Sequence, residues 1–190
     1  MSAFEDDIHH CLSVLESGGT ILYPTDTIWG IGCDATNESA VQKLYRIKER
    51  SVEKSMLILL ADERDLLKYV ASPDPAVFDF LKTTSRPTTI IYQNAIGFAP
   101  GLVRDDGSIG IRIVQEKFCR HLIKRFRKPI VSTSANYSGD PTPKKFSEIF
   151  NDIRTSVDYV VHYRRDETQE GQSSAILKWN SDGSQTVIRD

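Results

Sequence analysis

The residues from Lys128 to Gly139, Lys-Pro-Ile-Val-Ser-Thr-Ser-Ala-Asn-Tyr-Ser-Gly, combine an apolar run with a dense group of small polar side chains. Residues 129–131 predict a strand, and Ser132, Ser134 and Asn136 follow it. In an open α/β sheet, ligands bind beyond the carboxyl ends of strands, where hydroxyls and amides supply hydrogen bonds with little bulk. Because the same residue types are common in turns, the segment alone is equally consistent with an ordinary turn.

A second group with chemical potential is a cluster of cations within residues 43–54. Its members are Lys43, Arg46, Lys48, Arg50 and Lys54. Such a run is most often a solvated face, and cations late in a helix also suit the helix dipole. The cluster follows a glycine-containing loop and precedes the apolar run Met56 to Leu60. That position also suits a polyphosphate, which would be held by charge-assisted hydrogen bonds.

A third candidate lies near the N-terminus. Thr20 to Tyr23 is prone to form a strand, and Pro24 cannot continue a central ladder, so the next three residues lie at the strand tip. Gly30 and Gly32 then allow sharp or left-handed backbone. One interpretation is a plain turn, and the other is a pocket floor in which Thr27 presents its hydroxyl to a small ligand.

These three segments together resemble the YrdC-type threonylcarbamoyl-adenylate synthases. The motifs are Tyr-Pro-Thr-Asp-Thr-Ile-Trp-Gly (residues 23–30), Lys-Glu-Arg (48–50) and Ser-Thr-Ser-Ala-Asn-Tyr-Ser-Gly (132–139), in the family's order over nearly the whole chain. The resemblance implies an enzyme that joins L-threonine, bicarbonate or carbon dioxide and ATP, and releases pyrophosphate. Its product would serve threonylcarbamoyladenosine modification of tRNA, with downstream tRNA threonylcarbamoyl-transferase proteins as partners.

The resemblance also implies roles for individual residues. Catalytic roles fall on Lys48, Arg50 and Ser134. ATP binding falls on Lys48, Arg50, Lys54, Thr89, Ser132, Ser134, Asn136, Thr142 and Arg189. Thr27 and Ser174 would place threonine. Magnesium would arrive with ATP and sit near Ser134 and Asn136, with no metal site formed by protein side chains alone.

The chain departs from the family's pattern at five positions, which are Glu49, Ser51, Ser55, Gln93 and Val114. Glu49 replaces a glycine, and prolines are missing at the two serines and at Val114. Gln93 stands where some relatives have an arginine, so carboxylate recognition there is open. Arg112 matches the family's Val-Arg-x-Pro arginine, and its position in a predicted buried strand fits a structural ion pair as well as an active-site role.

Hydrophobic periodicity and turn residues predict alternating strands and helices with a C-terminal hairpin, hence an α/β fold. Strands are expected at 20–23, 56–60, 86–92, 108–114, 129–131, 158–162, 173–179 and 185–189, and helices at 3–17, 37–48, 115–126 and from 143, with short helices after 62 and 74. The resemblance adds a YrdC-like twisted open mixed sheet flanked by helices, with a large concave basic cleft. One domain, residues 1–190, is expected.

Composition narrows the function class. The chain has 39% hydrophobic and 26% charged residues, and no apolar run approaches the roughly 20 residues needed to span a bilayer. Three cysteines without Cys-x-x-Cys spacing predict buried reduced thiols in a cytoplasmic protein. No Gly-x-x-x-x-Gly-Lys-Ser/Thr loop occurs, which excludes P-loop phosphate transfer.

Two other functions remain alternatives at this point. The first is a module for double-stranded RNA or tRNA, although the net charge of -2 is low for a dedicated nucleic-acid coat. The predicted outer face of helix 115–126 is basic, and a solvated face is favoured over an RNA-facing patch. The second is a paralogue of the same fold with different or lost chemistry, for which the departures from the motifs are the evidence.

Overall fold

The computed structural model describes residues 4–49 and 56–190. In these ranges one mixed sheet has the strand order β7-β1-β2-β6-β3-β5-β4-β8-β9. The strands are β1 (Ile21–Tyr23), β2 (Gly30–Asp34), β3 (Leu57–Leu60), β4 (Thr88–Tyr92), β5 (Ile109–Ile113), β6 (Ile130–Ser134), β7 (Tyr159–Val160), β8 (Ala175–Trp179) and β9 (Gln185–Arg189). β1–β7, β3–β5 and β4–β8 pair in parallel, and the other neighbours pair antiparallel, so the predicted mixed sheet is confirmed.

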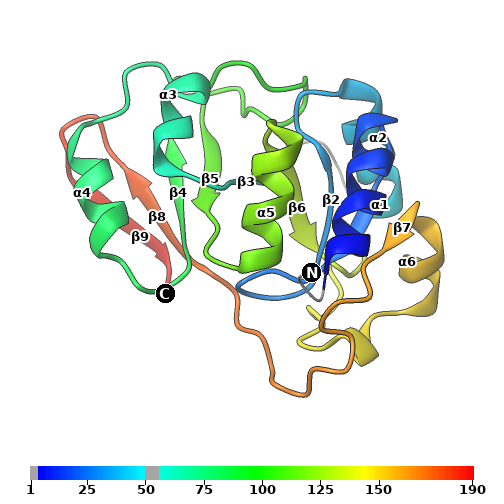
Figure 1. Cartoon of the computed structure of the whole chain (residues 1–190). Helices are drawn as coiled ribbons and strands as arrows, with labels where there is room; N and C mark the ends of the chain where they lie inside the picture. Colours follow the sequence, from blue (N-terminus) through cyan, green and yellow to red (C-terminus); the bar gives the residue numbers. More distant parts are fainter. Residues whose placement is uncertain (1–3, 50–55) are drawn as a thin grey trace.

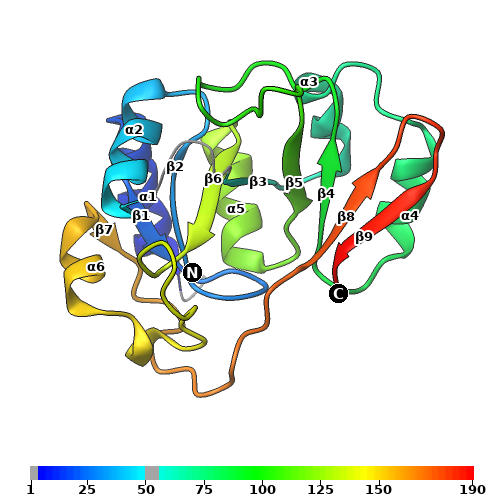
Figure 2. The same cartoon turned by 180° about the vertical axis from the view of Figure 1, so that it is seen from behind.

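Helices cover one face of the sheet more fully than the other. The helices are α1 (Glu5–Glu16), α2 (Glu38–Ile47), α3 (Leu66–Tyr69), α4 (Ala76–Thr83), α5 (Lys117–Phe126) and α6 (Asn151–Ser156), with short 3-10 helices η1 (Glu63–Asp65) and η2 (Phe146–Glu148). In Figure 1, α3, α4 and α5 lie in front of the central and C-terminal strands. Figure 2 shows the opposite face, where no helix lies in front of β5, β4 and β8. That face is therefore available for a ligand site.

Strand β2 was not expected from the sequence. Gly30 and Gly32 were predicted to form sharp backbone, but both lie in a buried strand that pairs with β6. Glycine is required here by close approach: a Cβ on Gly32 would lie 2.4 Å from the carbonyl oxygen of Val131. Pairing with β2 and β3 also carries β6 through Ser132 to Ser134, beyond the predicted end of that strand.

The predicted helix from residue 143 is the clearest error in secondary structure. Residues 146–148 form η2, a break follows, and α6 begins at Asn151. Phe146 packs against Trp29, with ring centroids 4.8 Å apart, and Arg154 and Arg165 stack over its ring. These tertiary contacts hold Phe146 to the body of the protein, while Phe150 is exposed, so the helical spacing of the apolar residues did not report one buried helix face.

Helix α1 is tied to the segment after β7 by a buried carboxylate. Asp7 accepts hydrogen bonds from the Tyr159 hydroxyl (2.7 Å) and from the backbone N–H groups of His162 and Tyr163 (2.9 Å each). Burial raises the pKa of Asp7, but these hydrogen bonds outweigh it, and the pKa lies below its ordinary value. The carboxylate thus joins α1 to residues 159–163, more than 150 residues later in the chain.

The core beneath the helices contains the three cysteines as free thiols. Cys11, Cys33 and Cys119 are each fully buried, and burial raises the pKa of each thiol. This confirms the prediction that they are buried and unpaired. Among the helices in the described ranges, none has the length and apolar character needed to cross a membrane.

Candidate functional site

A pocket of about 350 Å³ lies against the sheet where β2, β6, β3, β5, β4 and β8 meet. The described residues that line it are Thr25, Thr27, Ile28, Gly30, Met56, Leu57, Thr89, Ile91, Arg104, Gly110, Arg112, Ser132, Thr133, Ser134, Thr142, Ser173, Ser174, Ile176 and Arg189. Three of these are arginines and none is a carboxylic acid. The lining therefore favours an anionic ligand, as expected of the predicted basic cleft.

Strand register explains how the pocket wall is built. Side chains alternate between the two faces of a sheet, so residues two apart on one strand share a face with their cross-strand partners. Arg112 lies opposite Thr89, and Gly110 lies opposite Ile91, which places all four on the pocket wall. The wall is closely packed at Gly110, since a Cβ there would lie 3.2 Å from Thr89 Cγ2 and 3.9 Å from Leu57 Cβ.

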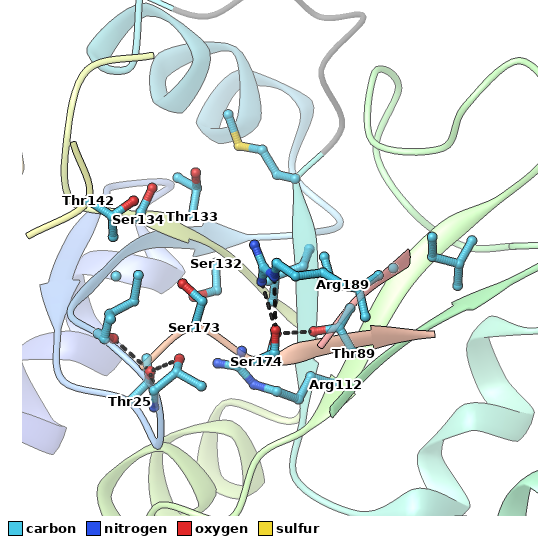
Figure 3. Close-up of a pocket in the computed structure, with 18 of the residues that line it drawn as sticks. Thr25, Thr89, Arg112, Ser132, Thr133, Ser134, Thr142, Ser173, Ser174 and Arg189 are labelled. Atoms are coloured by element: carbon cyan, nitrogen blue, oxygen red, sulfur yellow. Dashed lines mark hydrogen bonds between the residues drawn. The ribbon is translucent and has the colours of Figure 1, made fainter. Parts of the chain in front are cut away.

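One side of the pocket is rich in hydroxyl groups. Figure 3 shows Ser134, Thr133 and Thr142 gathered on this side, with Ser132 nearer the centre. The Ser134 hydroxyl donates to Asn136 Oδ1 at 2.5 Å, which fixes its direction. These groups come from β6 and the turn after it, the segment that the sequence singled out.

The loop after β1 has an ordered chain of hydroxyls. Thr25 Oγ1 donates to the carbonyl of Ile28 at 2.7 Å and accepts from the backbone N–H of Thr27 at 3.1 Å. The two threonine hydroxyl oxygens are 2.9 Å apart. Because the Thr25 proton is engaged by Ile28, Thr27 is the donor of this pair, and the two lone pairs of Thr27 Oγ1 can accept from a ligand.

The opposite side of the pocket joins β4, β8 and β9. The hydroxyls of Thr89 and Ser174 are hydrogen-bonded at 2.9 Å, and both side chains are buried. Arg189 donates from Nε (3.1 Å) and Nη2 (2.8 Å) to the carbonyl of Ser174. Figure 3 shows these residues beside Arg112. Arg189 therefore fixes the start of β8 as well as lining the pocket.

Arg112 meets both descriptions that the sequence left open. It is 3% exposed, and its Nη2 lies 3.2 Å from Asp26 Oδ1 in an ion pair. The other carboxylate oxygen of Asp26 accepts from the backbone N–H of Gln115 at 3.0 Å. Arg112 also lines the pocket, and its Nε has no hydrogen-bond partner among the described residues. The ion pair is therefore shown, and Arg112 also lies on the pocket wall, while an active-site role stays a prediction.

A second, more polar cavity of about 490 Å³ shares Thr25, Thr27, Ile28 and Ser173 with the first. It lies between the loop after β1 and the segment before β8. Gly171 presses against this loop so closely that a Cβ would lie 2.1 Å from the Thr27 carbonyl oxygen. The cations of this cavity have partners on the protein, including Glu170 for Lys144. The pocket beside β6 is therefore the better candidate for an anionic ligand.

The predicted site residues fall into three groups. Thr27, Thr89, Arg112, Ser132, Ser134, Thr142, Ser174 and Arg189 line the pocket together. Lys48, Asn136 and Gln93 do not line it; the Lys48 side chain is 1% exposed and contacts Ser134 and Asn136, instead of facing them across a cleft. Arg50 and Lys54, with the departures Ser51 and Ser55, lie outside the described residues.

Several lining residues were not assigned to a site by sequence reasoning, among them Thr25, Met56, Arg104 and Ser173. Thr25 and Ser173 adjoin predicted residues and repeat their chemistry, so the spacing Thr-x-Thr was a usable signal. Arg104 comes from the loop before β5, which was interpreted only as a connection. This loop is braced at its base, where Arg104 N–H donates to the Ser108 carbonyl at 2.9 Å.

Two departures from the motifs have visible structural consequences. Glu49 adopts a left-handed backbone with φ of 47°, a conformation that suits the glycine of the family motif better. Val114 donates its backbone N–H to the Leu60 carbonyl at 2.9 Å, a bond that proline could not make. The first departure adds strain, and the second extends the β3–β5 pairing.

Within the described residues, no group of three or more His, Cys, Asp and Glu side chains is placed to hold a metal ion. The donors on the hydroxyl side of the pocket are Ser134, Thr133 and Thr142. Magnesium usually retains waters and binds through substrate phosphates. These neutral oxygens therefore fit a hydrated magnesium ion that a nucleotide carries in.

Comparison with known proteins identifies the family. The model of the family described as Sua5_yciO_yrdC, telomere recombination, matches residues 13–190. The chain belongs to the Sua5/YciO/YrdC family. This confirms the resemblance drawn from the three sequence motifs.

Curated members of the Sua5/YciO/YrdC family are about one third identical in sequence to this chain over the aligned residues. A protein of Photobacterium profundum named threonylcarbamoyl-AMP synthase is 33% identical over 153 residues, 78% of this chain and 82% of its own. A protein of the same name from Idiomarina loihiensis is 34% identical over 148 residues, covering 75% and 78%.

Solved structures of Sua5/YciO/YrdC proteins share the fold. P. abyssi Sua5 complexed with L-threonine matches with a TM-score of 0.84 at 19% identity, over 97% of this chain and 54% of that one. E. coli YciO matches with a TM-score of 0.80 at 21% identity, over 97% and 89%. The chain thus spans about half the length of P. abyssi Sua5 and most of YciO, and the predicted YrdC-like fold is confirmed.

Proposed function

We propose that this protein is a threonylcarbamoyl-AMP synthase that uses L-threonine, bicarbonate or carbon dioxide, and ATP. The observation that carries the proposal is the pocket beside β6, whose described lining combines hydroxyls with three arginines and has no carboxylic acid. Curated relatives at 31–34% identity bear the synthase name. Because these relatives are named as synthases, the alternative of an RNA-binding module is not favoured.

L-Threonine would bind between the loop after β1 and the start of β8. A lone pair of Thr27 Oγ1 would accept from the substrate amine or hydroxyl. The carboxylate would receive hydrogen bonds from Arg112 and Ser174, and its charge would be matched by the guanidinium. Arg112 is held by Asp26 (3.2 Å), so its geometry would be set before substrate arrives. Gln93, which does not line the pocket, has no role in this scheme.

ATP would occupy the rest of the pocket. Hydroxyls of Ser132, Ser134 and Thr142 would meet the phosphates, and Thr89 and Arg189 would meet the far side of the nucleotide. Arg50 and Lys54 are proposed as further phosphate contacts on the strength of the motif alone. Magnesium bound to ATP would neutralise charge on the phosphate oxygens.

The chemistry would proceed in two steps. The threonine amine attacks the carbon of carbon dioxide, forms an N–C bond and loses a proton, which gives a carbamate. A carbamate oxygen then attacks the α-phosphorus of ATP, the bond to the β-phosphate oxygen breaks, and pyrophosphate leaves. No residue in this scheme acts as a covalent nucleophile. The protein would contribute proximity and stabilisation of developing negative charge.

The product would be a mixed anhydride, which hydrolyses readily in water. A cytoplasmic partner that transfers the threonylcarbamoyl group to tRNA would therefore be needed close by, and tRNA threonylcarbamoyl-transferase proteins fit that requirement.

The test is an assay of pyrophosphate release by purified protein with ATP and magnesium, adding threonine and bicarbonate separately and together. Release that requires both is the expected result, with threonylcarbamoyl-AMP identified by mass spectrometry. Threonine replaced by serine or valine separates recognition of the hydroxyl from that of the methyl group. Release that is independent of threonine would contradict the proposal.

A further inference from the structure

Lys48 follows α2, and its side chain runs inward instead of toward solvent. The residue is 1% exposed, among the most buried side chains of the described chain. It lies beneath the turn that leaves β6, residues 134–140. A lysine so deeply buried needs compensation for each of its three N–H donors.

The turn supplies that compensation with oxygens. The ammonium donates to the backbone carbonyls of Ser134 and Asn136 and to Asn136 Oδ1, the last at 3.0 Å. Among the described residues, the ammonium group thus has three acceptors in this turn. The backbone takes part as well, because the Lys48 carbonyl accepts from Ser138 N–H at 3.0 Å. The turn is thus wrapped around one residue at the end of α2.

Asn136 connects the Lys48 ammonium to a residue of the pocket wall. Its Oδ1 accepts from both the Lys48 ammonium and the Ser134 hydroxyl, while its Nδ2 donates to the Asp140 carbonyl at 2.7 Å. The side chain is 5% exposed, and both of its polar ends are engaged by the protein. Of these three residues, Ser134 lines the pocket, and Lys48 and Asn136 do not.

We infer that Lys48 and Asn136 are positioning residues: they hold the turn after β6 so that Ser134 Oγ, whose proton goes to Asn136, keeps its lone pairs toward the pocket and accepts from the water shell of the magnesium ion that ATP would carry, and Lys48 does not bind phosphate itself. The inference rests on the proposed function for the identity of the ligand. Its structural content, a buried lysine that organises residues 134–140, is independent of that ligand.

The first test is stability without ligand. We expect Lys48→Ala to lower Tm by roughly 5–10 °C, because buried carbonyl acceptors lose their donor. Lys48→Arg is expected to do the same, because a planar guanidinium does not reproduce the compact set of three donors on the ammonium. Arg46→Ala, two residues earlier on α2 and exposed, is the matched control and should keep the wild-type Tm. A Lys48→Ala protein with wild-type Tm would overturn the inference.

The second test is coupling. Lys48→Ala and Asn136→Ala should each destabilise the protein, and the double variant should lose less stability than the two losses added together, since both break one network. For pyrophosphate release, Lys48→Ala is expected to lower kcat by about 100-fold through misplacement of Ser134. Adding Ser134→Ala to Lys48→Ala should then cost little more.

The conservative variant separates the two roles of the lysine. If Lys48 contacted phosphate directly, Lys48→Arg would retain ATP affinity, since arginine is a good phosphate ligand. Retained ATP affinity and activity in Lys48→Arg would therefore refute the positioning role. Failure of the proposed function is distinguishable, because it would appear as a wild-type protein without threonine-dependent pyrophosphate release, while the stability and coupling results would still decide the role of Lys48.

Discussion

Arg112 and Asp26 form an ion pair at the wall of the pocket, with Nη2 3.2 Å from Oδ1 and both side chains buried. The pair joins β5 to the loop after β1, whose Thr27 also lines the pocket. One contact therefore links the fold's stability to the geometry of the proposed threonine site.

We predict that Arg112→Lys keeps the fold but loses activity, because lysine retains the charge without the planar pair of donors. Asp26→Asn should instead cost about 3–5 kcal/mol in stability, since it leaves a buried guanidinium without its counter-charge. Thermal unfolding and pyrophosphate release of both variants would measure these effects. An Arg112→Lys protein with full activity would remove Arg112 from the proposed ligand contacts.

Ser134→Ala should weaken the proposed reaction while leaving the fold intact. Loss of one hydrogen bond to a charged group, here the hydrated magnesium ion of the nucleotide, is worth about 1.5–3 kcal/mol, or about a 10- to 150-fold fall in kcat/KM. Ser138→Ala is the matched control, since Ser138 lies in the same turn outside the pocket lining. Circular dichroism would check the fold of each variant. Equal activity of the two variants would show that the turn has only a structural role.

Asp7 predicts a defined loss of stability in acid. Its folded pKa lies below the ordinary value of 3.8, so the ionised form stabilises the folded protein above that pH. As pH falls below 3.8 the unfolded chain takes up the proton first, and the contribution is lost toward the folded pKa. Asp7→Asn should lower Tm at neutral pH and show a smaller further loss between about pH 5 and about pH 3. Parallel pH profiles for the two proteins would contradict this role.

Glu49→Gly should stabilise the protein. Glu49 holds a left-handed φ of 47°, which costs an ordinary L-residue about 1 kcal/mol and costs glycine little. We expect Tm to rise by about 2–4 °C. Glu49→Ala is the control, since alanine keeps the strain and should give no gain. A gain of the same size in both variants would assign the effect to the carboxylate instead of the backbone.

Local signals predicted the elements where periodicity and burial agree. The helix expected at 37–48 begins where Asn37 caps α2 by accepting from Ala40 N–H, and the apolar stripe of α5 is buried. Strand β2 was missed because Gly-Ile-Gly-Cys-Asp lacks β-branched alternation. Its stability comes from long-range pairing with β6, which no local window contains.

The site residues also divide into those that the sequence predicted and those whose surroundings depend on distant parts of the chain. Eight predicted residues lie together, because paired strands and the loops beside them bring these residues to one face of the sheet. The environment of Lys48 could not be predicted, since a lysine after a helix is compatible with both a solvated and a buried ammonium. Only the turn after β6, more than eighty residues later in the chain, decides between them.

Gly110 gives the pocket an adjustable size. It lies opposite Ile91, and a Cβ there would lie 3.2 Å from Thr89 Cγ2, so Thr89 would have to yield by a few tenths of an ångström. Gly110→Ala would then be a shallower version of the same receptor. A substrate analogue that lacks one group at this place would fit the variant. The variant and the analogue would then form an orthogonal enzyme–substrate pair, and adding the analogue to a cell would activate the variant beside the wild-type protein.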